Sequence, residues 1–451
     1  MDDTIAVIST ALGVGAISII RVSGPDAISI VNKVSKSKNI LEVPSHTINY
    51  DHILDKDKII DEVLISIMRE PKTFTRENIV EINAHGGIAT TNKILEVLLK
   101  NGCRLAEPGE FTKRAFLNGR IDLTQAEGIM DLINAKTEKA RTLAINQVDG
   151  KVSNLIKELR KEIIEILANI EVNIDYPEYE DIEEMTIQNI IEATKNIELK
   201  IRIILKESEN GKLIKEGIKT SIIGRPNVGK SSLLNKLIGE EKAIVTEIEG
   251  TTRDTVEGTL NIDGILLNII DTAGIRKTED IVESIGVRKS LDLIEKSDLV
   301  LYVLNNNDLL SDEDMELLSK LKNKNHIVII NKSDLTNRLD ISNIDLKYIV
   351  KTSMIDDSGI EELKKIIKEI FNLEQIEQED LNYLSNARSI AILNKALLSI
   401  DDIQKGIKAK IPIDMLEINI KEVWNLLGEI IGETYQEELI DQLFSQFCLG
   451  K

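Results

Sequence analysis

An eight-residue segment in the second half of the chain has the residue types and spacing of a phosphate-binding loop. Residues 224–231 read Gly-Arg-Pro-Asn-Val-Gly-Lys-Ser, directly after an apolar run that ends at Ile223 and directly before a helix-like stretch. In such a loop the glycines let backbone N–H groups approach phosphate oxygens, the lysine neutralises β- and γ-phosphate charge, and the serine ligates Mg²⁺. The segment therefore predicts a nucleoside triphosphate site formed by Asn227, Val228, Gly229, Lys230, Ser231 and Ser232.

Three further motifs follow this loop along the chain. Asp271-Thr272-Ala273-Gly274 follows an apolar run, so that its aspartate can hold the Mg²⁺ shell and its glycine N–H can meet a γ-phosphate. Asn331-Lys332-Ser333-Asp334 follows another, and its aspartate can accept from the N1–H and the exocyclic amine of guanine, a donor pair that adenine lacks. Before both, Gly250-Thr251-Thr252 stands where a switch loop senses the γ-phosphate, with Thr252 as a Mg²⁺ ligand. Chance turns rich in Gly and Asp do not explain four motifs in this order, which predicts GTP rather than ATP.

One position departs from the pattern of Ras-type enzymes. The residue after Gly274 is Ile275, where those enzymes present a glutamine that orients the attacking water. A water-positioning group and a cation for the transition state are each worth orders of magnitude in rate. We therefore expect both to come from other parts of the molecule.

The elements that position these motifs fall into separate regions of the chain. Residues 1–118 alternate short β-branched runs with Gly and Pro, which is typical of a small α+β domain. Residues 119–216 and 377–451 have long helical periodicity, with Leu155, Leu159 and Ile163 on one face. Residues 217–376 repeat strand, loop and helix, as in a largely parallel, doubly wound sheet. The predicted fold is multidomain: an N-terminal α+β domain and an α-helical bundle domain interrupted by an inserted Ras-like α/β G domain of the P-loop NTPase class.

Composition narrows the setting in which this protein works. The 451 residues carry a formal net charge of -20, which disfavours unaided binding to nucleic acid. Residues 1–118 hold 14 Lys and Arg against 15 Asp and Glu, a net of -1, so an anionic ligand is better received there than elsewhere. No apolar run approaches the roughly 18 residues of a membrane span. With two cysteines and an acidic start, a cytoplasmic protein with no membrane contact is expected.

Blocks of sequence outside the G domain carry a more specific resemblance. They include Ile20-Arg21-Val22-Ser23-Gly24-Pro25, His85-Gly86-Gly87, the long block at residues 108–127 that contains Phe111-Thr112-Lys113-Arg114-Ala115-Phe116-Leu117-Asn118-Gly119-Arg120, and the ending Phe447-Cys448-Leu449-Gly450-Lys451. Together with the GTPase motifs, and over the full length, the chain resembles the MnmE (TrmE) family of tRNA modification GTPases.

The resemblance implies an architecture, an activity and partners. It implies that residues 1–118 form a tetrahydrofolate-binding and dimerisation domain, so that the protein is a homodimer. It implies a K⁺-stimulated GTPase that works with the FAD-dependent protein MnmG in a heterotetramer or larger complex. The expected reaction adds an aminomethyl or carboxymethylaminomethyl group to C5 of wobble uridine in tRNA. The one-carbon unit would come from 5,10-methylene- or 5-formyl-tetrahydrofolate, and tRNA would be contacted mainly through MnmG.

Residue roles follow from the same resemblance, motif by motif. Glu283 would orient the attacking water, and Cys448 belongs to a tail associated with the modification reaction, whether or not its thiol is a nucleophile. The G-domain loop adds Thr246, Glu247, Ile248 and Glu249 to the GTP-binding residues, and the K⁺ ligands would be Asn227, Thr246, Ile248 and Thr251. The folate pocket would be formed by Arg21, Glu81, Arg120 and Lys451.

Some positions differ from the usual family pattern. Thr75-Arg76-Glu77-Asn78 stands where Thr-Gly-Glu-Asp is common, Ala84 precedes His85 where glycine is common, and Ser389 stands where histidine is common. Two functions of other classes remain as alternatives. A GTP-switch ribosome-assembly factor would need a basic RNA-binding module, and a folate enzyme with a regulatory G domain would act on a substrate other than RNA.

Overall fold

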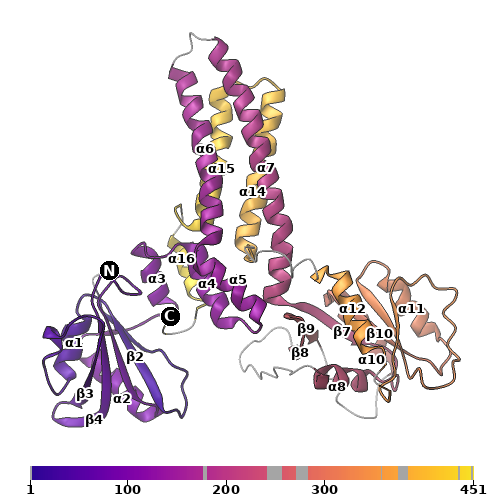
Figure 1. The fold of residues 1–451 in the computed structure, drawn as a ribbon, viewed down its shortest axis with the longest axis horizontal. Helices are drawn as coiled ribbons and strands as arrows, with labels where there is room; N and C mark the ends of the chain where they lie inside the picture. The colour runs from indigo at the N-terminus through magenta and orange to yellow at the C-terminus, as the bar shows by residue number, and fades with distance from the viewer. Residues whose placement is uncertain are drawn as a thin grey trace. The chain divides into compact units, whose positions relative to one another are not determined.

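The computed structural model describes residues 3–175, 180–240, 256–270, 283–356, 358–373, 384–434, 437–447 and 450. Contacts divide the chain into two compact units (Figure 1). The first contains Met1–Met130, Gln147–Leu199 and Ala391–Lys451, and the second contains Asp131–Asn146 and Lys200–Ile390.

The N-terminal part of the first unit is a six-stranded sheet in the order β3-β4-β5-β2-β1-β6. Neighbouring strands are antiparallel except for the parallel pair β1 and β6. Alternate residues of the strands point to a core that α1 and α2 close, which leaves the other face of the sheet for binding. The bounds are β1 (Ile5–Ile8), β2 (Ile17–Ser23), α1 (Ala27–Val34), β3 (Thr47–Asp55), β4 (Lys58–Met68), β5 (Ile79–His85), α2 (Ile88–Lys100) and β6 (Arg104–Leu105).

Helices make up the rest of the first unit and extend into the second. Of the predicted stripe on α6, Leu159 and Ile163 are buried, as are Ile166 and Ile170 further along the helix, whereas Leu155 is only partly buried. Helix α6 meets α7 through Asn196 Nδ2, which donates to Glu162 Oε2 at 3.2 Å, and α7 meets α14 through Gln404 Nε2, which donates to Glu198 Oε2 at 2.8 Å. The bounds are α3 (Glu110–Leu117), α4 (Leu123–Asn134), α5 (Glu138–Val148), α6 (Lys151–Asp175), α7 (Glu180–Glu216), α14 (Ala387–Lys408), α15 (Ile413–Ile431) and α16 (Glu437–Phe444).

The second unit contains a six-stranded sheet in the order β12-β11-β10-β7-β9-β8, parallel except for the β8–β9 pair. Successive residues of β10 face opposite sides: Leu301 and Val303 enter one apolar cluster, and Tyr302 and Leu304 another. Both faces are covered, as a doubly wound sheet requires. The bounds are β7 (Ile218–Ile223), α8 (Lys230–Glu240), β8 (Val256–Ile262), β9 (Ile265–Ile270), α10 (Glu283–Lys296), β10 (Leu299–Asn305), α11 (Asp312–Leu321), β11 (His326–Asn331), β12 (Ile349–Lys351) and α12 (Ile360–Ile370).

The predicted fold class is confirmed: an α+β domain, a helical domain and an α/β G domain occur in the predicted order. The insertion is visible in the chain path, since α7 ends at Glu216 immediately before β7 begins at Ile218. The exact boundaries at 118, 216 and 376 remain predictions, and the last falls in residues 374–383, outside the described part of the chain.

Candidate functional site

The phosphate-binding loop joins β7 to α8 in a conformation that only its residue types allow. At Gly224, φ is +146°, and an added Cβ would lie 2.3 Å from the Val303 carbonyl oxygen on β10. At Gly229, φ is +102°, and a Cβ would lie 2.0 Å from Asn331 Nδ2. Asn227 has φ of +61°, a left-handed conformation that asparagine tolerates better than most residues. Gly224 is therefore required by the close approach of the β10 backbone, and Gly229 by its positive φ and the close approach of the Asn331 side chain.

Lys230 is held inside this loop. Its Nζ donates hydrogen bonds to the carbonyl oxygens of Gly224 and Arg225, each at 2.7 Å. Burial lowers the pKa of the Lys230 ammonium, and the nearby Glu313 carboxylate opposes this shift. Because Lys230 opens α8, its backbone and that of Ser231 lie at a helix N-terminus, where unpaired N–H groups favour phosphate oxygens.

The predicted base-recognition motif is brought against the phosphate loop. Asn331 Nδ2 donates to the Val228 carbonyl at 2.9 Å, and Lys332 Nζ donates to the Asn227 carbonyl at 2.9 Å. The two hydrogen bonds connect segments that are distant in sequence: one lies at the end of β11 and the other follows β7. In the sheet, β10 lies between these two strands. At the other end of the motif, Ser353 Oγ donates to Asp334 Oδ1 at 2.9 Å. This hydrogen bond orients the carboxylate that is predicted to bind guanine.

One group at this site is not indicated by the sequence motifs. Arg225, inside the phosphate loop, places its Nε 3.0 Å from Asp314 Oδ2, and its Nη2 donates to the Leu309 carbonyl at 3.1 Å. Asp314 is fully buried and also accepts from the Tyr302 hydroxyl at 2.8 Å. The available sequence signal is the Ser311-x-x-Asp314 capping box at the start of α11, which predicts a helix start but not the arginine that packs against it.

Other predicted residues of this site lie outside the described part of the chain. Of the predicted Mg²⁺ ligands the structure describes Ser231, and of the predicted K⁺ ligands it describes Asn227. The Ser231 hydroxyl and the Asn227 amide both offer oxygen atoms, which hard cations prefer as ligands. Helix α10 begins at Glu283, but that side chain is outside the described set. Outside it as well are Thr246, Glu247, Ile248, Glu249, Gly250, Thr251, Thr252, Asp271, Thr272, Ala273, Gly274, Cys448 and Lys451.

A second candidate site lies on the N-terminal sheet. Arg21 on β2 and Glu81 on β5 are directly opposite in the antiparallel register, and Arg21 Nε donates to Glu81 Oε1 at 2.9 Å. Arg21 Nη1 also donates to the carbonyl of Gly450 at 3.2 Å, so the C-terminal tail reaches this pair. The Arg21 guanidinium carbon lies 5.7 Å from the centre of the Phe111 ring. The structure therefore brings together two predicted folate residues and the residue next to Lys451.

Arg120, the third predicted folate residue, occupies a neighbouring position. Its guanidinium lies 4.9 Å from the centre of the Phe74 ring, and its Nη1 donates to the Phe74 carbonyl at 3.1 Å. Phe74 and Phe111 pack in the same small apolar cluster, with Ile5 and Val7 of β1. Arg21 and Arg120 therefore sit over two rings of one cluster.

A buried ion network supports this site and explains part of the long block at residues 108–127. The Arg114 side chain is fully buried, and its Nη atoms donate to Asp3 Oδ1 at 2.8 Å, Glu77 Oε1 at 3.1 Å and Glu110 Oε1 at 2.9 Å. Burial raises the pKa of Glu110, but hydrogen bonds from Arg104 and Arg114 outweigh it and hold the pKa below 4.5. This network fastens α3 to β6 and to the segments that precede β1 and β5.

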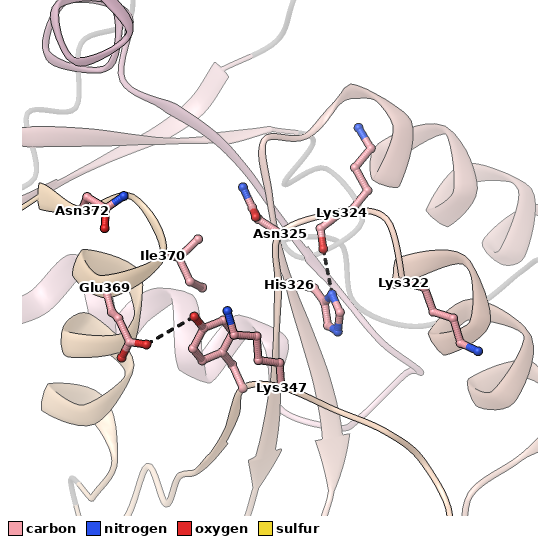
Figure 2. Close-up of a pocket in the computed structure, with 9 residues that line it drawn as sticks. Lys322, Lys324, Asn325, His326, Lys347, Glu369, Ile370 and Asn372 are labelled. Atoms are coloured by element: carbon pink, nitrogen blue, oxygen red, sulfur yellow. Dashed lines mark hydrogen bonds between the residues drawn. The ribbon is translucent and has the colours of Figure 1, made fainter. Parts of the chain in front are cut away.

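The cavity in Figure 2 belongs to a different part of the G domain. It measures about 480 Å³ and opens where β11 begins, whereas the nucleotide loops follow the strand ends. One of its lysines is held by the fold itself: Lys324 Nζ donates to the Glu295 carbonyl at 2.9 Å, at the end of α10. Cations near helix C-termini are expected there, so this cavity is not the nucleotide site.

Fold and site together define the class of protein. The Asn-Lys-x-Asp motif donates two hydrogen bonds to the phosphate loop, at the carboxyl ends of the strands of a mainly parallel sheet. This arrangement is that of a P-loop GTPase site. The family model described as "MnmE helical domain" matches residues 123–448, and the model described as "GTP-binding protein TrmE N-terminus" matches residues 4–120.

Curated relatives extend this match to the whole chain. The tRNA modification GTPases MnmE of Bacillus anthracis and Bacillus cytotoxicus are each 55% identical over 455 residues, covering 100% of this chain and 99% of theirs. The chain belongs to the MnmE family. The G domain of the T. maritima FeoB iron transporter aligns with 34% of this chain and 97% of its own at 27% identity and a TM-score of 0.25, too low to bear on the assignment.

In the part of the chain that the structure describes, the candidate sites are not accompanied by a membrane-spanning helix or a metal-binding cluster of side chains. Among the described residues, no helix has the length and apolar character needed to cross a bilayer. Within the same residues, no group of three or more His, Cys, Asp and Glu side chains is placed to hold a metal. Cys103 is a packed thiol, buried in the core of the N-terminal sheet, and this burial raises its pKa to about 12.

Proposed function

We propose that this chain hydrolyses GTP and, with the FAD-dependent protein MnmG, modifies C5 of wobble uridine in tRNA. The product would carry an aminomethyl or carboxymethylaminomethyl group whose one-carbon unit comes from 5,10-methylene- or 5-formyl-tetrahydrofolate. The observation that carries the proposal is the presence of two built sites in one chain. The clasped phosphate loop serves nucleotide, and the Arg21–Glu81 pair with the C-terminal tail serves a second ligand.

At the nucleotide site each described side chain has a role. Lys230 would exchange its bonds to loop carbonyls for phosphate oxygens, and Asp334, held by Ser353, would accept from guanine. Mg²⁺ at Ser231 and Thr252 would neutralise phosphate charge. K⁺ at Asn227, Thr246, Ile248 and Thr251 would supply the positive charge of an arginine finger, and Glu283 would orient water in place of the glutamine that Ile275 replaces.

At the second site the chemistry suits a folate. The Glu81 carboxylate can accept donors from a pterin edge, while the Arg21 and Arg120 guanidinium groups can donate to carboxylate or formyl oxygens. Phe74 and Phe111 offer an apolar floor beneath those groups. The tail with Cys448 and Lys451 would complete the pocket, which is supported by the hydrogen bond from Arg21 to Gly450.

The open face of the N-terminal sheet supports a homodimer. Large apolar side chains are exposed along it on β2, β3 and β4, where a soluble monomer would carry polar ones. Covering this face with a second copy would place two folate sites close to the dimer interface. The exposed residues are Ile17, Ile48, Tyr50 and Leu64.

The recruitment of tRNA is proposed to be indirect. A chain of net charge -20 repels a polyanion, so MnmG would supply most of the tRNA contacts in a heterotetramer or larger complex. The described residues include no basic RNA-binding module that would favour a ribosome-assembly role.

Nucleoside analysis tests the proposal directly. Mass spectrometry of tRNA nucleosides from a deletion strain should show loss of the C5 side chain, and the native sequence should restore it. Lys230→Ala, which removes the phosphate-loop cation, and Glu81→Gln, which removes the pterin acceptor, should both fail to restore it. Unchanged nucleosides in the deletion strain would refute the proposal and favour a folate enzyme with another substrate.

A further inference from the structure

Arg76 occupies a backbone conformation that favours glycine. Its φ is +59°, in the left-handed region that glycine adopts without steric cost. An arginine here is strained compared with glycine, and it brings a long cationic side chain to the loop before β5. At this position a strained backbone carries a charged side chain. The contacts of that side chain should therefore explain why an arginine is present.

The Arg76 side chain is held beside Arg120 by reciprocal hydrogen bonds between two loops. Arg76 Nη1 donates to the Asn118 carbonyl at 2.9 Å, and Asn118 Nδ2 donates back to the Thr75 carbonyl at 2.6 Å. Arg120 Nη1 in turn donates to the Phe74 carbonyl at 3.1 Å. A Cβ placed on Gly119 would lie 3.6 Å from Arg76 Nη1, so the Arg76 guanidinium packs against the residue before Arg120.

These two guanidinium groups are uncompensated within the described part of the chain. Neither Arg76 nor Arg120 forms an ion pair there, whereas Arg21, Arg104 and Arg114 in the same domain each pair with carboxylates. The partial burial of Arg120 and the charge of Arg76 both lower the pKa of Arg120, burial being the larger cause. Two neighbouring like charges without a counterion repel each other, and an anion that contacts both relieves this repulsion.

We propose that Arg76 and Arg120 bind the two carboxylates of the glutamate end of the folate, with one guanidinium for each carboxylate. This inference rests on the proposed function, because it assigns the ligand of the same pocket. Arg21 is already paired with Glu81, at the part of the site suited to the pterin, which leaves the Arg76–Arg120 pair for the opposite end of the ligand. Arg76 is then a specificity residue that recognises the glutamate.

The test compares two ligands that differ only in that glutamate. Binding of 5-formyltetrahydrofolate and of the primary amide of 5-formyltetrahydropteroate (the pteroate form), which lacks the glutamate and both of its carboxylates, is measured by calorimetry on the full chain. The native protein should prefer the glutamate form by at least about threefold, the size expected for an exposed charge pair. Arg76→Gly should weaken that preference, because only Arg120 then pairs with a carboxylate, should leave the affinity for the pteroate form unchanged, and should not lower thermal stability because glycine relaxes the positive φ.

A matched control separates recognition from general charge. Lys56 also has a positive φ, +58°, and lies exposed in the turn between β3 and β4. Lys56→Gly removes one charge from the same domain and relaxes the same kind of backbone strain, and it should leave the glutamate preference intact. Raising the salt concentration should reduce the preference of the native chain more than that of Arg76→Gly, which keeps only the Arg120 pair.

The possible failures point to different errors. If the native chain binds neither ligand, both the folate assignment and this inference are wrong. If it binds both ligands, loses both with Glu81→Gln, and shows the same glutamate preference with Arg76→Gly, the folate pocket stands and the role of Arg76 is refuted. If Arg76→Gly instead weakens dimerisation or tRNA binding and spares the glutamate preference, the pair serves a macromolecular partner and the inference is overturned.

Discussion

Replacement of Arg114 by methionine should loosen the N-terminal domain by a predictable amount. Arg114 is fully buried, and methionine fills much of its volume without its charge or hydrogen bonds. Removing one partner of a buried ion pair costs about 3–5 kcal/mol, because the remaining charge is left unpaired. Here Arg104 still pairs with Asp3 and Glu110, and mainly Glu77 loses its cation. We therefore expect the lower end, about 3 kcal/mol.

Cys103 provides the assay. This residue is 7% exposed and lies immediately before β6. Strand β6 pairs with β1, which begins close to Asp3, and Asp3 forms an ion pair with Arg114. With Cys448→Ser in all proteins, Cys103 is the sole thiol, so its rate of labelling reports opening of this domain. A loss of about 3 kcal/mol corresponds to labelling about 150-fold faster, since each 1.4 kcal/mol is a factor of ten.

Arg104→Met is the matched control, because the Arg104 side chain is 44% exposed and its removal leaves Arg114 in place. Exposed pairs contribute about 0.2–1 kcal/mol, so labelling should rise no more than about fivefold. The reasoning is refuted if Arg114→Met labels at the native rate and unfolds at the same urea concentration. Equal acceleration by both substitutions would also contradict it, because burial would then not decide the cost.

Four further predictions concern pH and the nucleotide site. Because the folded pKa of Glu110 lies below 4.5, its stabilising contribution should be complete above that pH and lost as pH falls through the folded pKa, so thiol labelling should accelerate in acid; a flat profile would argue against it. GTP turnover should be much faster in K⁺ than in Na⁺, and Asn227→Ala should remove this difference; equal native rates in the two salts would exclude a cation finger. Asp334→Asn should weaken GTP binding and strengthen xanthosine triphosphate binding in nucleotide titrations, and an unchanged preference would remove Asp334 from the base pocket. Asp314→Leu should raise the dissociation rate of a fluorescent GTP analogue by releasing Arg225, whereas Tyr302→Phe, which keeps the carboxylate, should change it by less than about tenfold.

Much of the nucleotide site can be predicted from sequence because its parts are local. A loop such as residues 224–231 binds phosphate through its own backbone, and the glycine spacing alone specifies where that backbone can come close. The same holds for the alternation of strands and helices that predicts the doubly wound sheet. The resemblance to a family adds Arg21, Glu81 and Arg120, whose roles no local pattern indicates.

Tertiary structure alone decides which distant side chains meet. Asp314 lies far along the chain from Arg225, and its local sequence indicates only a helix cap, yet the strand order of the G-domain sheet brings the two together. In the sequence Arg76 is only a departure from glycine, and its place beside Arg120 depends on two loops that hold each other by hydrogen bonds. Sequence spacing determines what a segment can bind through its own backbone. Contacts between side chains on separate segments depend on strand order, register and loop packing, which are set by the burial of the whole core.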